Sequence, residues 1–96
     1  MISGVNEKEE NIIKNILKDY PYQFYFYGSR VKGDYTKSSD LDILIKSENE
    51  IPEHVMNGLE LKFNESLIPY VVNIADFSKL NENFYKLIEP TLVSVF

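Results

Sequence analysis

The sequence of 96 residues is long enough for a single hydrophobic core, and we expect residues 1–96 to form one domain. Fifteen acidic residues against ten basic ones give a net charge of −5, which argues against direct nucleic-acid binding because that binding depends on basic residues. The absence of cysteine from the sequence excludes disulfides and thiolate metal sites. No apolar run approaches the roughly 20 residues of a membrane helix, and the acidic N-terminus lacks the features of a secretory signal. We therefore expect a cytoplasmic protein without membrane contact.

The first 27 residues predict a helix followed by a strand. Asn6 and Glu9 have the spacing of a capping box, and apolar residues follow them at helical intervals: Ile12, Ile13, Ile16 and Leu17. This helix should end before Pro21, because proline disfavours helical geometry in the residue before it. Residues 23–27 then alternate as in a strand, with phenylalanines on one face and tyrosines on the other. Core packing is the favoured role of these rings, with nucleobase stacking as the alternative.

Gly28 and Ser29 interrupt the apolar pattern after this strand. Glycine lets a ligand approach the backbone closely, and a short helical turn from Ser29 would present backbone N–H groups to phosphates. Arg30 is the only arginine of the chain, and a guanidinium group suits phosphate geometry. Lys32 and Lys37 lie in the same segment, where they either offset phosphate charge or belong to a solvated loop.

Residues 40–45 predict a second strand that opens with two aspartates. Side chains two positions apart share a face, so Asp40 and Asp42 project together, and the apolar residues of the other face are Leu41, Ile43 and Ile45. Adjacent carboxylates raise each other's pKa, and a bound cation relieves that repulsion. Mg²⁺ in particular is usually held by one or two carboxylates together with phosphates. The alternative is that Asp40 merely caps the strand and Asp42 is a surface residue.

The second half of the chain predicts two more helices and two more strands. A helix from Pro52 carries the apolar residues Val55, Met56, Leu59, Phe63 and Leu67. Residues 70–75 are apolar enough for a central strand. Ser78 or Asn81 would cap a last helix, with Phe84, Leu87 and Ile88 on its apolar side, that ends at Pro90, and residues 92–96 predict a short final strand. His54 is a poor metal-ligand candidate, because the chain has no second histidine.

Gly28-Ser29, followed after ten residues by Asp40-x-Asp42, resembles the signature of minimal nucleotidyltransferases, small members of the DNA polymerase β superfamily. The flanking segments agree, with an aromatic strand before the pair and an Arg-x-Lys-Gly-Asp run after it. The resemblance implies an α+β nucleotidyltransferase fold, in which helices pack on a small mixed β-sheet. It also implies ATP as substrate and Mg²⁺ as cofactor, with Mn²⁺ as a substitute. The residues expected to bind metal are Asp40 and Asp42, and those expected to bind nucleotide are Gly28, Ser29, Arg30 and Ser39.

The same resemblance implies a reaction and a partner. Members of this family transfer a nucleoside monophosphate to an acceptor hydroxyl. Minimal nucleotidyltransferases of this kind are commonly paired with a HEPN-type ribonuclease toxin, which they restrain as antitoxins, in some cases by adenylylating it. We therefore expect an adenylyltransferase that acts on such a toxin as its antitoxin.

One position departs from the family pattern. The resemblance places Asn73 where the family has a third acidic residue, so the expected catalytic set is Asp40, Asp42 and Asn73. Asparagine can ligate a cation, but it is neutral and cannot accept a proton. Asp76 should point to the opposite face or lie beyond the strand end. Two alternatives to a protein adenylyltransferase therefore stay open: a catalytically silent module that neutralises its partner by docking, and a transferase that acts alone on a small molecule.

Overall fold

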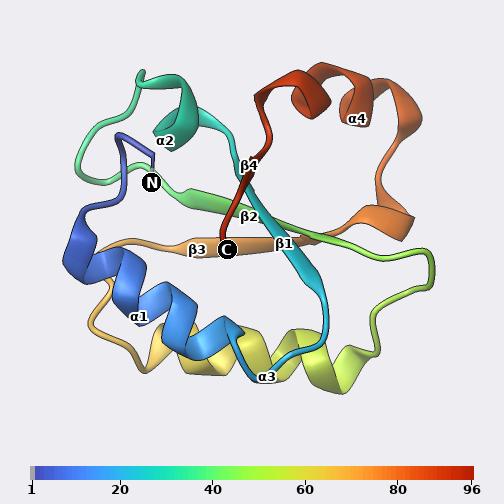
Figure 1. The fold of residues 1–96 in the computed structure, drawn as a ribbon, viewed down its shortest axis with the longest axis horizontal. Coiled ribbons are helices and arrows are strands. Elements are labelled where there is room, and N and C mark those ends of the chain that lie inside the picture. The colour runs from blue at the N-terminus through green and yellow to red at the C-terminus, as the bar shows by residue number, and fades with distance from the viewer. Residues whose placement is uncertain (1) are drawn as a thin grey trace.

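The structure, a computed structural model, describes residues 2–96 and has a four-stranded mixed sheet with helices on both faces. The strand order is β3-β2-β1-β4, with β1 antiparallel to β2 and β4, and β2 parallel to β3. In Figure 1, α1 and α3 lie together on one side of the sheet and α2 and α4 on the other. The elements are α1 Glu7–Leu17, β1 Gln23–Tyr27, α2 Ser29–Lys32, β2 Leu41–Lys46, α3 Glu53–Asn64, β3 Val72–Asp76, η1 Phe77–Lys79, α4 Glu82–Ile88, η2 Glu89–Thr91 and β4 Val93–Ser94.

The predicted α+β architecture, with helices packed on a small mixed sheet, is confirmed, and the local signals that predicted it are visible in the structure. The Asn6 side chain accepts a hydrogen bond of 2.8 Å from the Glu9 backbone N–H, and the Glu9 carboxylate accepts one of 3.2 Å from the Asn6 N–H. This reciprocal pair satisfies two backbone donors at the start of α1. The apolar side of α1 then buries Ile13 and Leu17 against the sheet.

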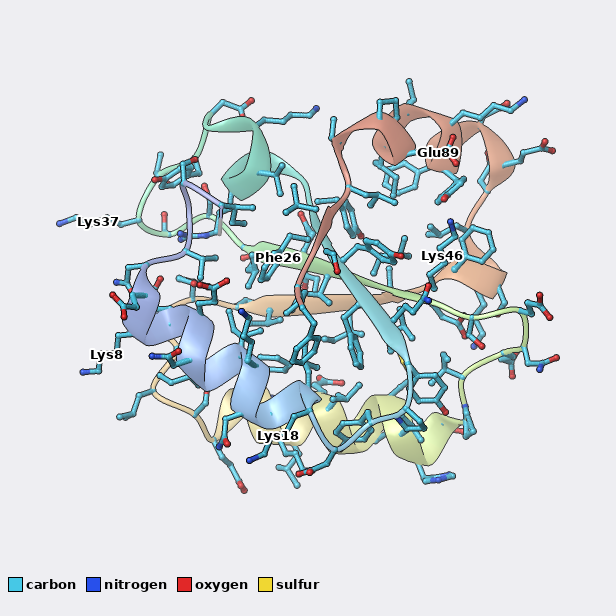
Figure 2. All side chains as sticks on the ribbon, in the orientation of Figure 1. Lys8, Lys18, Phe26, Lys37, Lys46 and Glu89 are labelled. Carbon is cyan, nitrogen blue, oxygen red and sulfur yellow. The ribbon has the colours of Figure 1, made fainter. Side chains whose placement is uncertain are left out.

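The two faces of the sheet carry different side chains. The larger cluster lies under α1 and α3 and contains, among other residues, Phe24, Phe26, Leu41, Ile43, Ile45, Leu59 and Phe63. Phe26 lies in the interior, whereas Lys8, Lys18 and Lys37 project outward (Figure 2). A smaller cluster on the opposite face joins Tyr27 and Leu44 to Ile88 of α4. The aspartates and asparagine of interest alternate with core residues, so they belong to this second, less covered face.

Several predicted boundaries and roles are wrong. β3 begins at Val72 and is an edge strand, not a central one. α3 ends at Asn64, and in the turn that follows, the Ser66 hydroxyl donates to the Phe63 carbonyl. Leu67 lies beyond the helix and is exposed instead of packed. Asn81 caps α4, and of the three apolar residues expected on its buried side only Ile88 is buried, while Phe84 and Leu87 are exposed.

The final strand is shorter than expected: it comprises Val93 and Ser94, and the N–H of the next residue, Val95, also donates to the Phe24 carbonyl of β1 at 3.0 Å. Within residues 2–96, none of the helices has both the length and the apolar character needed to cross a membrane.

Candidate active site

Asp40, Asp42 and Asn73 meet at one end of the β2–β3 pair. The parallel register places Asp42 beside Asn73, and Asp40 lies just before β2 begins. The Asn73 amide nitrogen Nδ2 donates to Asp40 Oδ2 at 3.1 Å and to Asp42 Oδ1 at 3.3 Å. Two carboxylates from neighbouring positions thus converge on one nitrogen atom. All three residues predicted as the catalytic set are therefore brought together.

The turn at Gly28 lies against the other side of Asp42. Gly28 has φ 86° and ψ −161°, a backbone conformation that is essentially restricted to glycine. A Cβ atom at this position would overlap Asp42 Oδ2. Asp42 is therefore held between β3, which its Oδ1 faces, and the Gly28 backbone, which its Oδ2 faces. Because Gly28 has no side chain, the Asp42 carboxylate can lie against its backbone. The same feature would let a ligand approach that backbone closely.

α2 begins directly after this glycine. The N–H groups of Val31 and Lys32 both bond to the Gly28 carbonyl at 3.1 Å, and that of Gly33 bonds to the Ser29 carbonyl at 2.9 Å. The first N–H groups of a helical turn have no partner within the turn. The turn therefore starts at Ser29 as predicted, beside the paired carboxylates.

Charge and burial shift the pKa values of the groups around Asp42. Burial raises the pKa of the half-buried Asp42 carboxyl, the Asn73 hydrogen bond acts in the opposite sense, and the nearby Asp40 charge raises it further. Burial, followed by the Asp42 charge, also raises the pKa of Tyr27, which pairs with Asp42 across β1 and β2. The Tyr27 ring in turn meets Phe84 of α4 edge-on, with 6.4 Å between ring centroids. The site is consequently an electronegative position on the sheet face, flanked by an aromatic pair.

Arg30 of α2 is buried, and backbone carbonyls surround its guanidinium group. Its side chain is 4% exposed, and it donates to four backbone carbonyls: Gly4 at 2.7 Å, Ser39 at 3.0 Å, Lys37 at 3.1 Å and Thr36 at 3.4 Å. The guanidinium group also lies over the Tyr70 ring, 3.7 Å from its centroid. This arrangement gives Arg30 a structural role that the sequence did not predict. It joins the N-terminal segment to the loop that precedes β2.

Ser39 also helps to shape this loop. Its carbonyl accepts from Arg30 Nε, and its hydroxyl accepts from the Thr36 backbone N–H at 2.9 Å. Sequence reasoning missed the contribution of Gly4, whose N–H bonds to the Arg30 carbonyl at 3.0 Å and which has no room for a Cβ atom beside Arg30. A lone glycine near the N-terminus has no pattern that could have revealed this contact.

Asp76 is not part of the site. It is the last residue of β3, pairs with Ile45, and is buried. Its Oδ2 accepts from the Ile51 N–H at 2.8 Å, and its Oδ1 accepts from the Ser78 N–H at 2.9 Å and the Ser78 hydroxyl at 2.8 Å. Burial alone would raise the pKa of Asp76, but these hydrogen bonds outweigh it and hold the pKa below its usual value. The carboxylate is thus committed to the β2–α3 connection and to η1.

The oxygen atoms at the site suit one hard divalent cation. Asp40 and Asp42 present converging carboxylates, and carboxylates combined with phosphates are the usual ligands of Mg²⁺. Among residues 2–96 there is no cluster of three or more histidine, cysteine or acidic side chains of the kind that holds a metal without help. A cation at this position would therefore take its remaining ligands from water and from a bound nucleotide.

A mixed sheet that holds two aspartates against a glycine–serine turn defines a nucleotidyltransferase-type fold. The chain belongs to the nucleotidyltransferase domain family, whose pattern it matches over residues 9–94. It is 33% identical over 93 residues to the "Probable protein adenylyltransferase MntA" of Haemophilus influenzae, a match that covers 95% of this chain and 82% of that protein. It also superposes, with a TM-score of 0.73 and 20% identity, on a chain of the "Crystal structure of the toxin-antitoxin with AMP-PNP", covering 91% of this chain and 72% of that one. The second likeness concerns the fold.

Proposed function

We propose that this protein binds Mg²⁺ and ATP at Asp40 and Asp42 and transfers AMP to a hydroxyl of a partner protein, a HEPN-type ribonuclease toxin that it restrains as an antitoxin. The observation that carries the proposal is the convergence of the two carboxylates beside the Gly28-Ser29 turn. The likeness to a described protein adenylyltransferase supports the reaction class. The likeness to a toxin–antitoxin chain supports the kind of partner.

In this proposal the residues of the chain have separate roles. Asp40 and Asp42 hold the cation, and the backbone N–H groups at the start of α2, with the Ser29 hydroxyl, bind phosphate oxygens. A bound Mg²⁺ supplies positive charge that stabilises the charge developing on the phosphates. Gly28 keeps Asp42 in position because no side chain intervenes between them.

The transfer itself exchanges one bond for another. The acceptor hydroxyl oxygen forms a bond to the α-phosphorus of ATP, and the bond from that phosphorus to the pyrophosphate oxygen breaks. Pyrophosphate leaves, and the hydroxyl proton passes to water, because the Asn73 amide is neutral and has no basic lone pair. General-base assistance typically contributes about a hundred- to ten-thousand-fold in rate. We therefore expect a slow transferase.

Incubation with Mg²⁺, ATP labelled at the α-phosphate and the toxin partner tests this proposal. The expected result is label on the partner and a mass increase of one AMP per modified hydroxyl by intact mass spectrometry. Asp42→Asn should abolish the label, whereas Asp19→Asn, which changes an exposed aspartate at the end of α1, should not. Absence of label with the parent protein under saturating ATP would contradict the transfer reaction.

A second function is favoured by one observation, the engagement of both Asn73 amide hydrogens by the aspartates. With a neutral amide where a proton acceptor is expected, the domain would bind its partner without modifying it. Stoichiometric silencing of the toxin by the parent and by Asp42→Asn alike, with no label transferred, would establish this docking function in place of the transferase.

A further inference from the structure

We propose that the Asn73 amide acts as a built-in substitute for a second cation, so that the site binds a single divalent cation per chain, together with the nucleotide. This inference rests on the proposed binding of Mg²⁺ and ATP and specifies the metal content of that site. It concerns this chain's own residues: two carboxylates, one amide and, among residues 2–96, no third acid in the cluster.

The geometry of Asn73 is that of a bridging donor. An asparagine amide has two N–H hydrogens, and here Nδ2 lies 3.1 Å from Asp40 Oδ2 and 3.3 Å from Asp42 Oδ1. Each hydrogen is therefore directed to a different carboxylate. The amide nitrogen carries partial positive charge between two negative groups, which is the electrostatic role that a cation would have. The carboxylates are consequently held in place without any metal.

The supply of protein ligands at the site favours one dication over two. Asp40 and Asp42 are the two carboxylates that converge there, and a cation that arrives with the nucleotide already uses them. Paired-metal sites hold their ions roughly 3.5–4 Å apart, and at that distance the ions repel each other unless carboxylates bridge them. The neighbouring acid Asp76 is committed to Ile51 and Ser78, and no third histidine, cysteine or acid joins the cluster among residues 2–96.

Competition between the amide and a cation adds a further consequence. The amide engages Asp40 Oδ2 and Asp42 Oδ1, so a single cation bound beside it is left with the remaining oxygens of the two carboxylates. Binding of the metal alone should therefore be weak, and nucleotide phosphates should strengthen it by adding ligands. The site would load a preformed metal–nucleotide complex in preference to free metal.

Native mass spectrometry with Mn²⁺ and a non-hydrolysable ATP analogue counts both components on each chain. The expected composition of the parent is one Mn²⁺ and one nucleotide, with no Mn–Mn coupling by electron paramagnetic resonance. Asn73→Asp should take up a second Mn²⁺, introduce that coupling and tighten metal binding at least about tenfold. Asn57→Asp, which adds the same charge on exposed α3 across the sheet, should behave as the parent.

The outcomes separate this inference from the function on which it rests. Two coupled Mn²⁺ ions in the parent would overturn the single-cation inference and leave metal–nucleotide binding intact. Nucleotide without any Mn²⁺ in the parent would overturn both. Because the parent count is decisive, the test holds even if Asn73→Asp folds poorly with three crowded carboxylates.

Discussion

Gly28 and Asp42 are in such close contact that the turn and the carboxylate form one structural unit. A Cβ atom on Gly28 would overlap Asp42 Oδ2, while Oδ1 of the same carboxylate accepts from Asn73. The position of the carboxylate is therefore defined from two directions, by a backbone on one side and an amide on the other. Mutations on either side should displace it.

Gly28→Ala tests this contact. We expect the free energy of unfolding to fall by about 3 kcal/mol, because the conformation is restricted to glycine and Asp42 must move. Gly33→Ala is the matched control, since Gly33 also has a positive φ of 95° but nothing lies within 4 Å of its added Cβ. Its expected loss is about 1–2 kcal/mol. Urea denaturation measures both, and equal losses would contradict a specific role for the Asp42 contact.

Asp42→Asn tests the metal assignment through stability. In the parent, Mg²⁺ with ATP at about a hundred times the dissociation constant should stabilise the fold by about 2.7 kcal/mol. The variant should lose most of this shift while its ligand-free form keeps the parent's stability, because it removes a carboxylate whose pKa burial already raises. Thermal unfolding with and without Mg²⁺–ATP provides the measurement. An undiminished shift in Asp42→Asn would remove Asp42 from the metal site.

Arg30→Lys tests the structural role of the only arginine. Lysine cannot reproduce a planar fork that reaches four carbonyls and stacks on Tyr70. We expect a loss of about 3 kcal/mol, comparable with the breaking of several buried hydrogen bonds. Lys32→Ala, an exposed change in the same turn, should have little effect. If Arg30→Lys keeps its stability but binds ATP much more weakly, the phosphate role predicted from the sequence is the correct one.

Asp76 should contribute to the acid sensitivity of the fold. Its folded pKa lies below the ordinary value of 3.8, so its stabilising contribution is complete above that value and is lost as the pH falls through the folded pKa. Urea midpoints between about pH 6 and about pH 2 should therefore fall less steeply in Asp76→Asn, from a lower starting stability. Asp34→Asn, in the exposed loop before β2, serves as control. Identical acid profiles for parent and Asp76→Asn would contradict this contribution.

The parts of the fold that depend on neighbouring residues could be predicted from the sequence. The capping box at Asn6 and the alternation around Asp40 and Asp42 involve residues at most three positions apart, and the structure places them as expected. The contact of Asp42 with Asn73 spans 31 positions and depends on the parallel register, which no local pattern encodes. It was anticipated only through resemblance to a family.

Two features could not be read from the sequence for physical reasons. The partners of Arg30 are backbone carbonyls, which every residue carries, so its burial has no sequence signature. The apolar residues of β3 gave the pattern of a central strand, but an edge strand covered by helix on one face can have the same composition. Which strand lies at the edge of the sheet depends on the connections between elements. Here α3 connects β2 to the parallel strand β3, which lies at the edge.

Because β3 is an edge strand, its position affects how large a molecule can approach the aspartates. Along the described chain no strand lies beyond β3, so Asn73 borders the open rim of the sheet. Asp40 and Asn73 are exposed at this edge, so a molecule can approach them without any separation of the strands. For the proposed transfer reaction, we therefore expect selection of the acceptor to depend on how well its surface matches this edge of the sheet.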